Sequence, residues 1–190
     1  QSIPALQPYL VDLYVEFHGS VVEPVVLCEG AQGYGLDVDW GDYPYVTSSH
    51  CTTAGALLNG IPAQSIREVY GVAKAYDTYV GAKKFHGEGR VFDLMQQLGN
   101  EFGSTTGRPR QCNWMNIREL KKAVDISGVT TVIINKVDIM REVGHWNLRA
   151  AENNAIFMQL GSEEGWKSYI RRYLDTGELK VLFSESPEEI

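Results

Sequence analysis

Residues 129–138, with the sequence VTTVIINKVD, constrain the fold of this chain more than any other segment. The segment is β-branched and apolar through Val132, Ile133 and Ile134, as in a strand buried on both faces, and it becomes polar at Asn135. Such strands belong to parallel sheets, whose carboxyl ends face ligands. The segment therefore predicts an α/β fold with a largely parallel sheet flanked by helices, and a ligand site near its polar end.

The rest of the chain alternates between helical and strand patterns and contains no internal repeat or low-complexity tract. Apolar residues recur at helical spacing in four segments, which are residues 7–17, 91–102, 115–128 and 163–177, and Gly128 closes the third of these helices. Strands are predicted at 25–28, within 67–81 and within 179–186. The connecting segments are a glycine-rich turn at 30–35, an ordered functional loop at 37–59 and a loop at 103–114.

Composition excludes several classes of protein. The chain has 190 residues with 17 Lys+Arg against 24 Asp+Glu, and its net charge of −7 argues against a general duplex DNA or RNA binder. The sequence has no apolar run long enough for a membrane span and no secretion signal in its first ten residues. Three scattered cysteines without a CxxC pair, and four scattered histidines, argue against a disulfide framework or a transition-metal site. We expect a cytoplasmic protein.

The word NKVD at residues 135–138 is the most interpretable short motif. After a buried strand, a carboxylate such as Asp138 can accept hydrogen bonds from the ring N–H and the exocyclic amine of guanine, and the stem of Lys136 can cover the base. Adenine offers no such pair of donors. The alternative reading is a solvated turn at a strand end, because a four-residue word also arises by chance.

The segment GSTTGRPRQ at residues 103–111 concentrates groups that bind anions. Glycine N–H groups and hydroxyls can line a carboxylate or a phosphate, and Arg108 and Arg110 add planar forks for bidentate contacts. Pro109 stiffens the chain between the two arginines. The alternative is a surface loop whose arginines pair with neighbouring acids.

A third candidate is the turn that carries Gln32. Its glycine-flanked amide brings a neutral donor and acceptor close to a ligand, and the acids Asp37 and Asp39 and the hydroxyl of Thr47 follow. Asp37 and Asp39 alternate as on a strand, so we expect at least one of them to face solvent. The chain has no GxxxxGK[ST], GxGxxG or GxSxG motif, so a phosphate loop is not supplied by these residues.

Taken in order, EGAQGYGLDVDWGDYPYVTSSHCTTAG, KAYDTYVGA, GNEFGSTTGRPRQCNW and the strand ending NKVD closely resemble the adenylosuccinate synthetase family. The resemblance implies a ligase of purine biosynthesis that joins L-aspartate to the 6-position of IMP, with GTP and Mg²⁺, through a 6-phosphoryl intermediate. It also implies a homodimer. In fold, it implies that residues 1–190 form a single domain, an incomplete, P-loop-NTPase-like portion of a larger synthetase fold that lacks its amino-terminal part.

The resemblance also assigns site residues. Gln32 and Arg110 would stabilise charge during catalysis, with Arg110 also near the GTP phosphates, and Arg108 would bridge aspartate and the ribose. The purine nucleotide would be bound by Gln32, Thr47, Val80 and Arg108. L-aspartate would be bound by Ser104, Thr105, Thr106, Arg108 and Arg110. GTP would be bound by Lys136, Asp138, Ser184 and Ser186.

Departures from the family pattern leave alternatives open. The family's phosphate loop, general-base Asp, general-acid His and Mg²⁺ ligands belong to an amino-terminal portion that these residues do not match, so the chain is expected to act only with that portion. Tyr79 stands where the family has Arg, and Ser186 where it has Gly. One alternative is the reaction of a viral branch, which joins aspartate to a guanine deoxynucleotide and can use an adenine nucleotide as donor. Others are a non-catalytic purine-nucleotide-binding remnant and a structural domain whose loops bind nothing.

Overall fold

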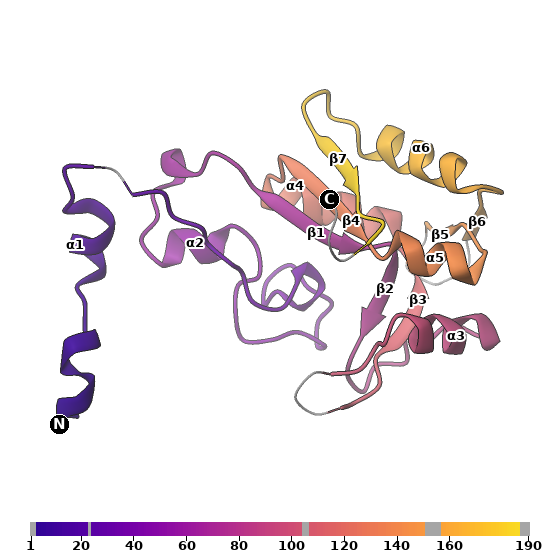
Figure 1. Ribbon diagram of the computed structural model, residues 1–190, viewed down its shortest axis with the longest axis horizontal. Coiled ribbons are helices and arrows are strands. Elements are labelled where there is room, and N and C mark those ends of the chain that lie inside the picture. Colours follow the sequence, from indigo (N-terminus) through magenta and orange to yellow (C-terminus); the bar gives the residue numbers. More distant parts are fainter. Residues whose placement is uncertain (1–2, 23, 104–106, 151–156, 187–190) are drawn as a thin grey trace.

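The computed structural model describes residues 3–22, 24–103, 107–150 and 157–186. Its amino-terminal part consists of short helices joined by extended chain and lies to one side of the sheet, in indigo and violet in Figure 1. The helices of this part are α1 (Leu13–His18), α2 (Ala54–Leu58) and short 3₁₀ turns at Pro4–Tyr9, Tyr34–Leu36 and Ala63–Ser65. None of these helices contains a buried residue.

A three-stranded parallel sheet in the order β1-β4-β7 forms the centre of the fold. Its strands are β1 (Tyr70–Lys74), β4 (Thr131–Asn135) and β7 (Lys180–Phe183). The sheet confirms the predicted parallel α/β architecture, with the apolar segment ending in NKVD as the middle strand. Both edges of β4 are paired, and Val132 and Ile134 are fully buried, as expected of an unbroken apolar strand in a parallel sheet.

Helices and two antiparallel strand pairs surround this sheet. Helix α4 (Ile117–Ser127) packs against α6 (Glu163–Leu174), and α3 (Arg90–Leu98) packs against α5 (Val137–Val143). One antiparallel pair joins β2 (Tyr76–Tyr79) to β3 (Gln111–Trp114), and the other joins β5 (Asn147–Arg149) to β6 (Phe157–Gln159). Figure 1 shows β2, β3 and α3 grouped below the parallel sheet.

The hydrophobic core lies between the parallel sheet and these helices. Trp166 of α6 is fully buried, and its ring centroid lies 5.6 Å from that of Trp146 and 5.8 Å from that of Phe183. Helix α4 ends at Gly128 as predicted, and Gly128 adopts a left-handed φ of 62°. The helix begins after Asn116, two residues later than predicted, because the Asn116 side chain accepts hydrogen bonds from two backbone N–H groups of the first turn.

Two sequence predictions of secondary structure are wrong. Residues 25–28 form no strand, and Val25 and Leu27 are almost fully exposed, because no strand in the described part of the chain pairs with them. The predicted loop 103–114 ends in a strand, β3, because Gln111–Trp114 pairs with β2. The predicted helix at 7–17 is present only as α1 and the preceding 3₁₀ turn. No helix of the described residues combines the length and apolar character that a membrane span needs.

Candidate functional site

The carboxyl ends of the parallel strands bring the NKVD residues next to the last strand. Asn135 ends β4 beside Lys74, and the N–H of Ser184 donates to the carbonyl of Ile134 at 2.9 Å. Helix α5 begins at Val137, so Asp138 lies in its first turn. Lys136, Asp138 and Ser184 therefore share one edge of the sheet, as expected of groups that would contact one base.

Lys136 has a strained conformation at this edge. Its φ of 64° lies in the left-handed region, which non-glycine residues rarely adopt and which often marks functional positions. Its Nζ donates to the carbonyl of Gly99 at 3.1 Å, next to the end of α3. The side-chain oxygen of Asn135 is buried and has no hydrogen-bond partner among the described residues. Such an orphaned acceptor costs roughly 1–3 kcal/mol and points to a missing donor.

Ser186 lies just beyond β7. The hydroxyl of Ser184 donates to the Ser186 carbonyl at 2.8 Å, and Glu185 between them pairs with Arg141 of α5 at 3.0 Å and with Lys167 of α6 at 2.7 Å. These contacts attach the end of β7 to the helix that carries Asp138. The predicted set Lys136, Asp138, Ser184 and Ser186 is thus held in one neighbourhood.

The arginine loop is a hairpin closed by backbone pairing. Phe102 bridges Pro109, the N–H of Gly103 donates to the Arg108 carbonyl at 2.9 Å, and the N–H of Arg110 donates to the Glu101 carbonyl at 2.8 Å. Arg108 is exposed, whereas Arg110 is one-third exposed. The predicted aspartate-binding residues Ser104, Thr105 and Thr106 lie outside the described residues.

A buried charge cluster joins this loop to the parallel sheet. The carboxylate of Glu101, only 2% exposed, contacts Lys74 Nζ at 2.7 Å and Arg110 Nη1 at 3.2 Å, and it accepts from Tyr76 Oη at 2.8 Å. Burial raises the pKa of Glu101, but these three donors outweigh it and leave the pKa below its usual value. The carboxylate is therefore charged at neutral pH and neutralises only one of its two cationic partners.

Val80 lies beside the same loop. Strands β2 and β3 pair through Tyr79 and Gln111, so Val80 and Arg110 lie next to each other at one end of the pair. The Gln111 side chain accepts from the N–H groups of Phe85 and His86 at 2.8 and 2.9 Å, which fixes the segment after Val80. The described structure thus brings the predicted nucleotide contact Val80 to the arginine loop.

The turn of Gln32 belongs to a separate loop that is organised by Asp37. Asp37 is fully buried, and its two carboxylate oxygens accept from the N–H groups of Asp39, Trp40 and Cys51 at 2.9, 3.0 and 2.6 Å. Asp39 is exposed, as expected for one of the two acids. The exposed Gln32 has a φ of 57°, and its Oε1 accepts from the Ser49 hydroxyl at 3.0 Å.

Thr47 is fixed by the same loop, because its N–H donates to the Leu36 carbonyl at 2.8 Å. Asp37, Asp39 and His50 form a grouping of potential metal ligands within the described residues. Asp37 fits that role poorly, since both of its oxygens already accept backbone N–H groups. The Asp37 carboxylate therefore holds the backbone of this loop in place.

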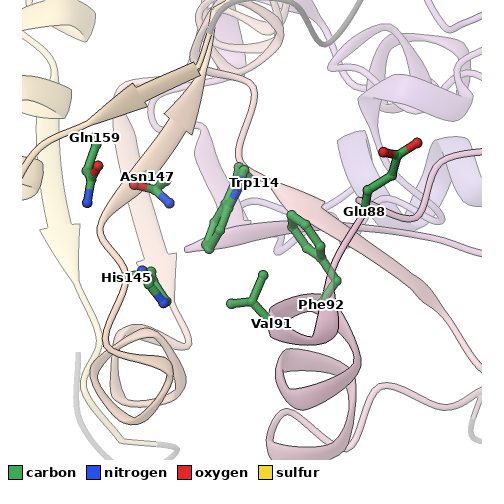
Figure 2. A pocket seen from close by; sticks show the side chains of 7 residues that line it. All are labelled: Glu88, Val91, Phe92, Trp114, His145, Asn147 and Gln159. Atoms are coloured by element: carbon green, nitrogen blue, oxygen red, sulfur yellow. The ribbon is translucent and has the colours of Figure 1, made fainter.

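A pocket of about 300 Å³ lies apart from these residues, between the start of α3 and the β5–β6 pair. Figure 2 shows Phe92 and Trp114 on one side and His145 and Asn147 on the other. The Phe92 and Trp114 rings form a tilted pair with centroids 5.0 Å apart. Among the described residues, no site residue predicted from the sequence lines this pocket.

Sequence reasoning assigned no ligand contact to Lys74, Tyr76, Glu101 or Asn135. All four lie in motifs that carry the family resemblance, namely KAYDTYVGA, GNEFGSTTGRPRQCNW and NKVD. The sequence contains one signal for them: the charged residues Lys74 and Glu101 occur in otherwise apolar or turn-forming segments, next to motifs that bind anions. The pairing of β1 with β4 brings Lys74 beside Asn135, and Glu101 contacts Lys74 and Tyr76 only in the folded chain. These contacts could not be inferred from local patterns.

Comparison with known proteins identifies relatives of this chain. The model of the family described as adenylosuccinate synthetase matches residues 1–149. An adenylosuccinate synthetase of Flavobacterium johnsoniae is 51% identical over 120 residues, which cover 60% of this chain and 28% of that protein. One of Lodderomyces elongisporus is 36% identical over 186 residues, which cover 96% of this chain and 42% of that protein.

A solved structure agrees with the fold. The fully ligated adenylosuccinate synthetase from Plasmodium falciparum superposes with a TM-score of 0.73 at 24% identity, covering 84% of this chain and 47% of that chain. This chain therefore spans less than half the length of these three relatives.

Proposed function

We propose, because the chain belongs to the adenylosuccinate synthetase family, that it forms the substrate-binding portion of an enzyme that ligates L-aspartate to the 6-position of IMP with GTP. One observation carries the proposal. The GTP-site candidates Lys136 and Asp138 directly follow Asn135, which lies beside Lys74, and Lys74 is linked through Glu101 to the aspartate-site candidate Arg110. A ligase that uses both substrates needs such adjacent sites.

The described residues suit particular roles. Asp138 would accept from the two donors of guanine, and Lys136 would cover the base. Arg110 would bind a carboxylate through its planar fork and stabilise charge on the transferred phosphoryl group. Gln32 would contact the 6-position of the acceptor purine, and Thr47 its 5′-phosphate. The backbone next to Val80 would contact the ribose.

Mg²⁺ would neutralise phosphate charge in this reaction. Within the described residues, the grouping of Asp37, Asp39 and His50 is poorly suited to hold it, because Asp37 is committed to three backbone donors. We therefore place the Mg²⁺ ligands, the general base and the general acid in the part of the family fold for which this chain has no counterpart.

Exposed apolar surface supports the need for that part. Tyr70 and Val72 of β1 are 55% and 68% exposed, and within the described residues β1 pairs with a strand only on its β4 side. Val25 and Leu27, predicted as a buried strand, are also exposed. Exposed strand edges and apolar patches of this kind mark surfaces that pack against further protein. We propose that the remaining portion, in the same polypeptide or in a separate one, covers them, and that the complete enzyme is a homodimer.

The test combines this chain with the amino-terminal portion of the Lodderomyces elongisporus relative and measures phosphate release with GTP, L-aspartate and IMP. The expected result is turnover that depends on all three substrates. Arg108→Leu is expected to raise the aspartate and nucleotide KM by at least about tenfold, since it removes charge-assisted contacts. The matched control Arg172→Leu changes an exposed arginine of α6 and is expected to leave both KM values unchanged.

The other outcomes separate the alternatives. Turnover with dGMP but not with IMP would assign the acceptor of the viral branch, and use of ATP instead of GTP would refute the guanine role of Asp138. Nucleotide binding without turnover would indicate a non-catalytic remnant. Failure of guanine nucleotides to bind the complete assembly would show that the NKVD and arginine segments are only surface turns.

A further inference from the structure

Glu101 is the most deeply buried carboxylate next to the candidate ligand edge. Its Oε1 accepts from Lys74 Nζ at 2.8 Å and Tyr76 Oη at 2.8 Å, and its Oε2 accepts from Lys74 Nζ at 2.7 Å and Arg110 Nη1 at 3.2 Å. A buried charge persists only when donors compensate it, so these contacts fix the carboxylate in one orientation.

The backbone of Arg110 does not depend on the Glu101 side chain. The N–H of Arg110 donates to the Glu101 carbonyl, and the Phe102–Pro109 bridge closes the hairpin beside it. The amide of Gln96 donates to the Arg110 carbonyl. These main-chain contacts fix the position of the Arg110 backbone. Within Arg110, the Glu101 carboxylate contacts only the guanidinium group.

The charges at this position leave Arg110 able to bind a second anion. Lys74 and Arg110 share one carboxylate, so the group of three keeps a positive charge. The Arg110 side chain is 34% exposed, and a guanidinium has five N–H donors, of which one is bonded to Glu101. An arginine that is anchored on one side in this way presents its other donors in a fixed direction, which reduces the entropy lost when an anion binds.

We propose that Glu101, held by Lys74 and Tyr76, is a positioning residue that sets the direction in which Arg110 presents its guanidinium to the carboxylate of the amino-acid substrate. The substrate part of this inference rests on the proposed function. The orientation part rests only on the contacts of Glu101 and can be measured without any substrate.

The first experiment measures the side-chain ¹⁵N–¹H NMR signals of arginine in this chain, with Arg110→Lys used for assignment. Wild type is expected to show a slowly exchanging Arg110 guanidinium signal, because the ion pair shields its protons. Glu101→Gln keeps the shape of the side chain but removes its charge, and it is expected to lose that signal. The control Glu164→Gln, whose carboxylate is 82% exposed on α6, is expected to retain it.

The second experiment measures kinetics after this chain is combined with the amino-terminal portion of a relative. Glu101→Gln is expected to raise the aspartate KM by at least about tenfold, the usual effect of losing a charge-assisted contact, and to change the IMP KM less than about twofold. Tyr76→Phe removes one donor to Glu101 without changing charge, and it is expected to raise the aspartate KM by about twofold to fivefold. A merely structural role would raise both KM values together.

The outcomes separate this inference from the proposed function. An unchanged Arg110 signal in Glu101→Gln, or equal effects on both KM values, overturns the inference. If Glu101→Gln does not fold, Tyr76→Phe is tested by the same two measurements. A wild-type Arg110 signal together with a wild-type aspartate KM in Tyr76→Phe overturns the inference. An Arg110 signal that behaves as expected, in an assembly without ligase activity, refutes the proposed function and the substrate part while supporting the orientation part.

Discussion

The loop that carries Gln32 and Thr47 is predicted to depend on the charge of Asp37. In Asp37→Asn, the amide oxygen can replace Oδ1, which accepts from Asp39 and Trp40. The amide –NH₂ then takes the place of Oδ2 and faces the N–H of Cys51, which donates to Oδ2 at 2.6 Å. A donor replaces an acceptor at a fully buried position, so the Cys51 N–H loses its partner.

The magnitude follows from this single lost contact. A hydrogen bond to a charged group contributes about 1.5–3 kcal/mol, and an orphaned buried donor costs a similar amount. The free energy of opening the loop at residues 37–51 is therefore expected to fall by about 1.5–3 kcal/mol. Each 1.4 kcal/mol corresponds to a factor of ten, so amide protection falls about tenfold to a hundredfold.

Amide hydrogen exchange measured by NMR tests this prediction at the N–H groups of Asp39, Trp40 and Cys51. The control is Asp39→Asn, because the Asp39 side chain is 65% exposed and pairs only with His50 among the described residues. Protection in the control is expected to match wild type. Equal protection in Asp37→Asn and wild type would refute the reasoning that the carboxylate organises the loop.

The same contact predicts a pH dependence. Burial raises the pKa of Asp37, but its backbone N–H donors and nearby His50 outweigh burial, and the pKa is lowered from its ordinary value of 3.8. A lowered folded-state pKa means that the stabilisation is complete above the unfolded value and is lost as the pH falls through the folded value. Protection of the Cys51 N–H is therefore expected to fall below about pH 4. A flat profile down to pH 2 would contradict the prediction.

Three further predictions concern the base site and the stability of the fold. Asp138→Asn replaces one acceptor by a donor, so in the complete enzyme the ratio of KM for GTP to KM for XTP is expected to rise at least about tenfold, measured by steady-state kinetics; an unchanged ratio would refute the guanine contact. Trp166→Ala removes a fully buried ring and is expected to lower the free energy of unfolding by about 3–5 kcal/mol in urea denaturation, against no more than about 1 kcal/mol for the partly exposed Tyr173→Phe. Gly128→Ala is expected to cost about 1 kcal/mol by the same assay, because Gly128 has a φ of 62°, and no loss would show that the helix end tolerates a side chain.

The central sheet could be predicted because its signal is local. The unbroken apolar run of β4 and its polar end indicate a buried parallel strand whatever its neighbours are. The end of helix α4 could be predicted for the same reason, since Gly128 marks it. In both cases the residues that decide the structure lie within the segment itself.

The antiparallel pairs could not be predicted in this way. Gln111–Trp114 looks like a loop because it contains two polar residues and follows glycine and proline, yet it pairs with β2. The opposite error occurred at residues 25–28, where a strand-like sequence has no partner in the described part of the chain. Strand formation depends on a partner strand that can be distant in sequence, so composition alone does not predict whether residues 25–28 or 111–114 form a strand.

The candidate site shows the same division between local motifs and distant contacts. NKVD and the arginine loop can be recognised as sequence motifs, because ligand chemistry requires particular groups at fixed spacing. Glu101, which pairs with Arg110, and Lys74, which pairs with Glu101, lie 27 positions apart in sequence and meet only in the folded chain. A family resemblance transfers the groups that touch the substrate, whereas the groups that orient them must be found from burial and hydrogen bonding. Glu101 is such a group, because its buried carboxylate is neutralised by cationic partners and holds one side of the partly exposed Arg110 guanidinium. The other donors of Arg110 then point toward a second anion.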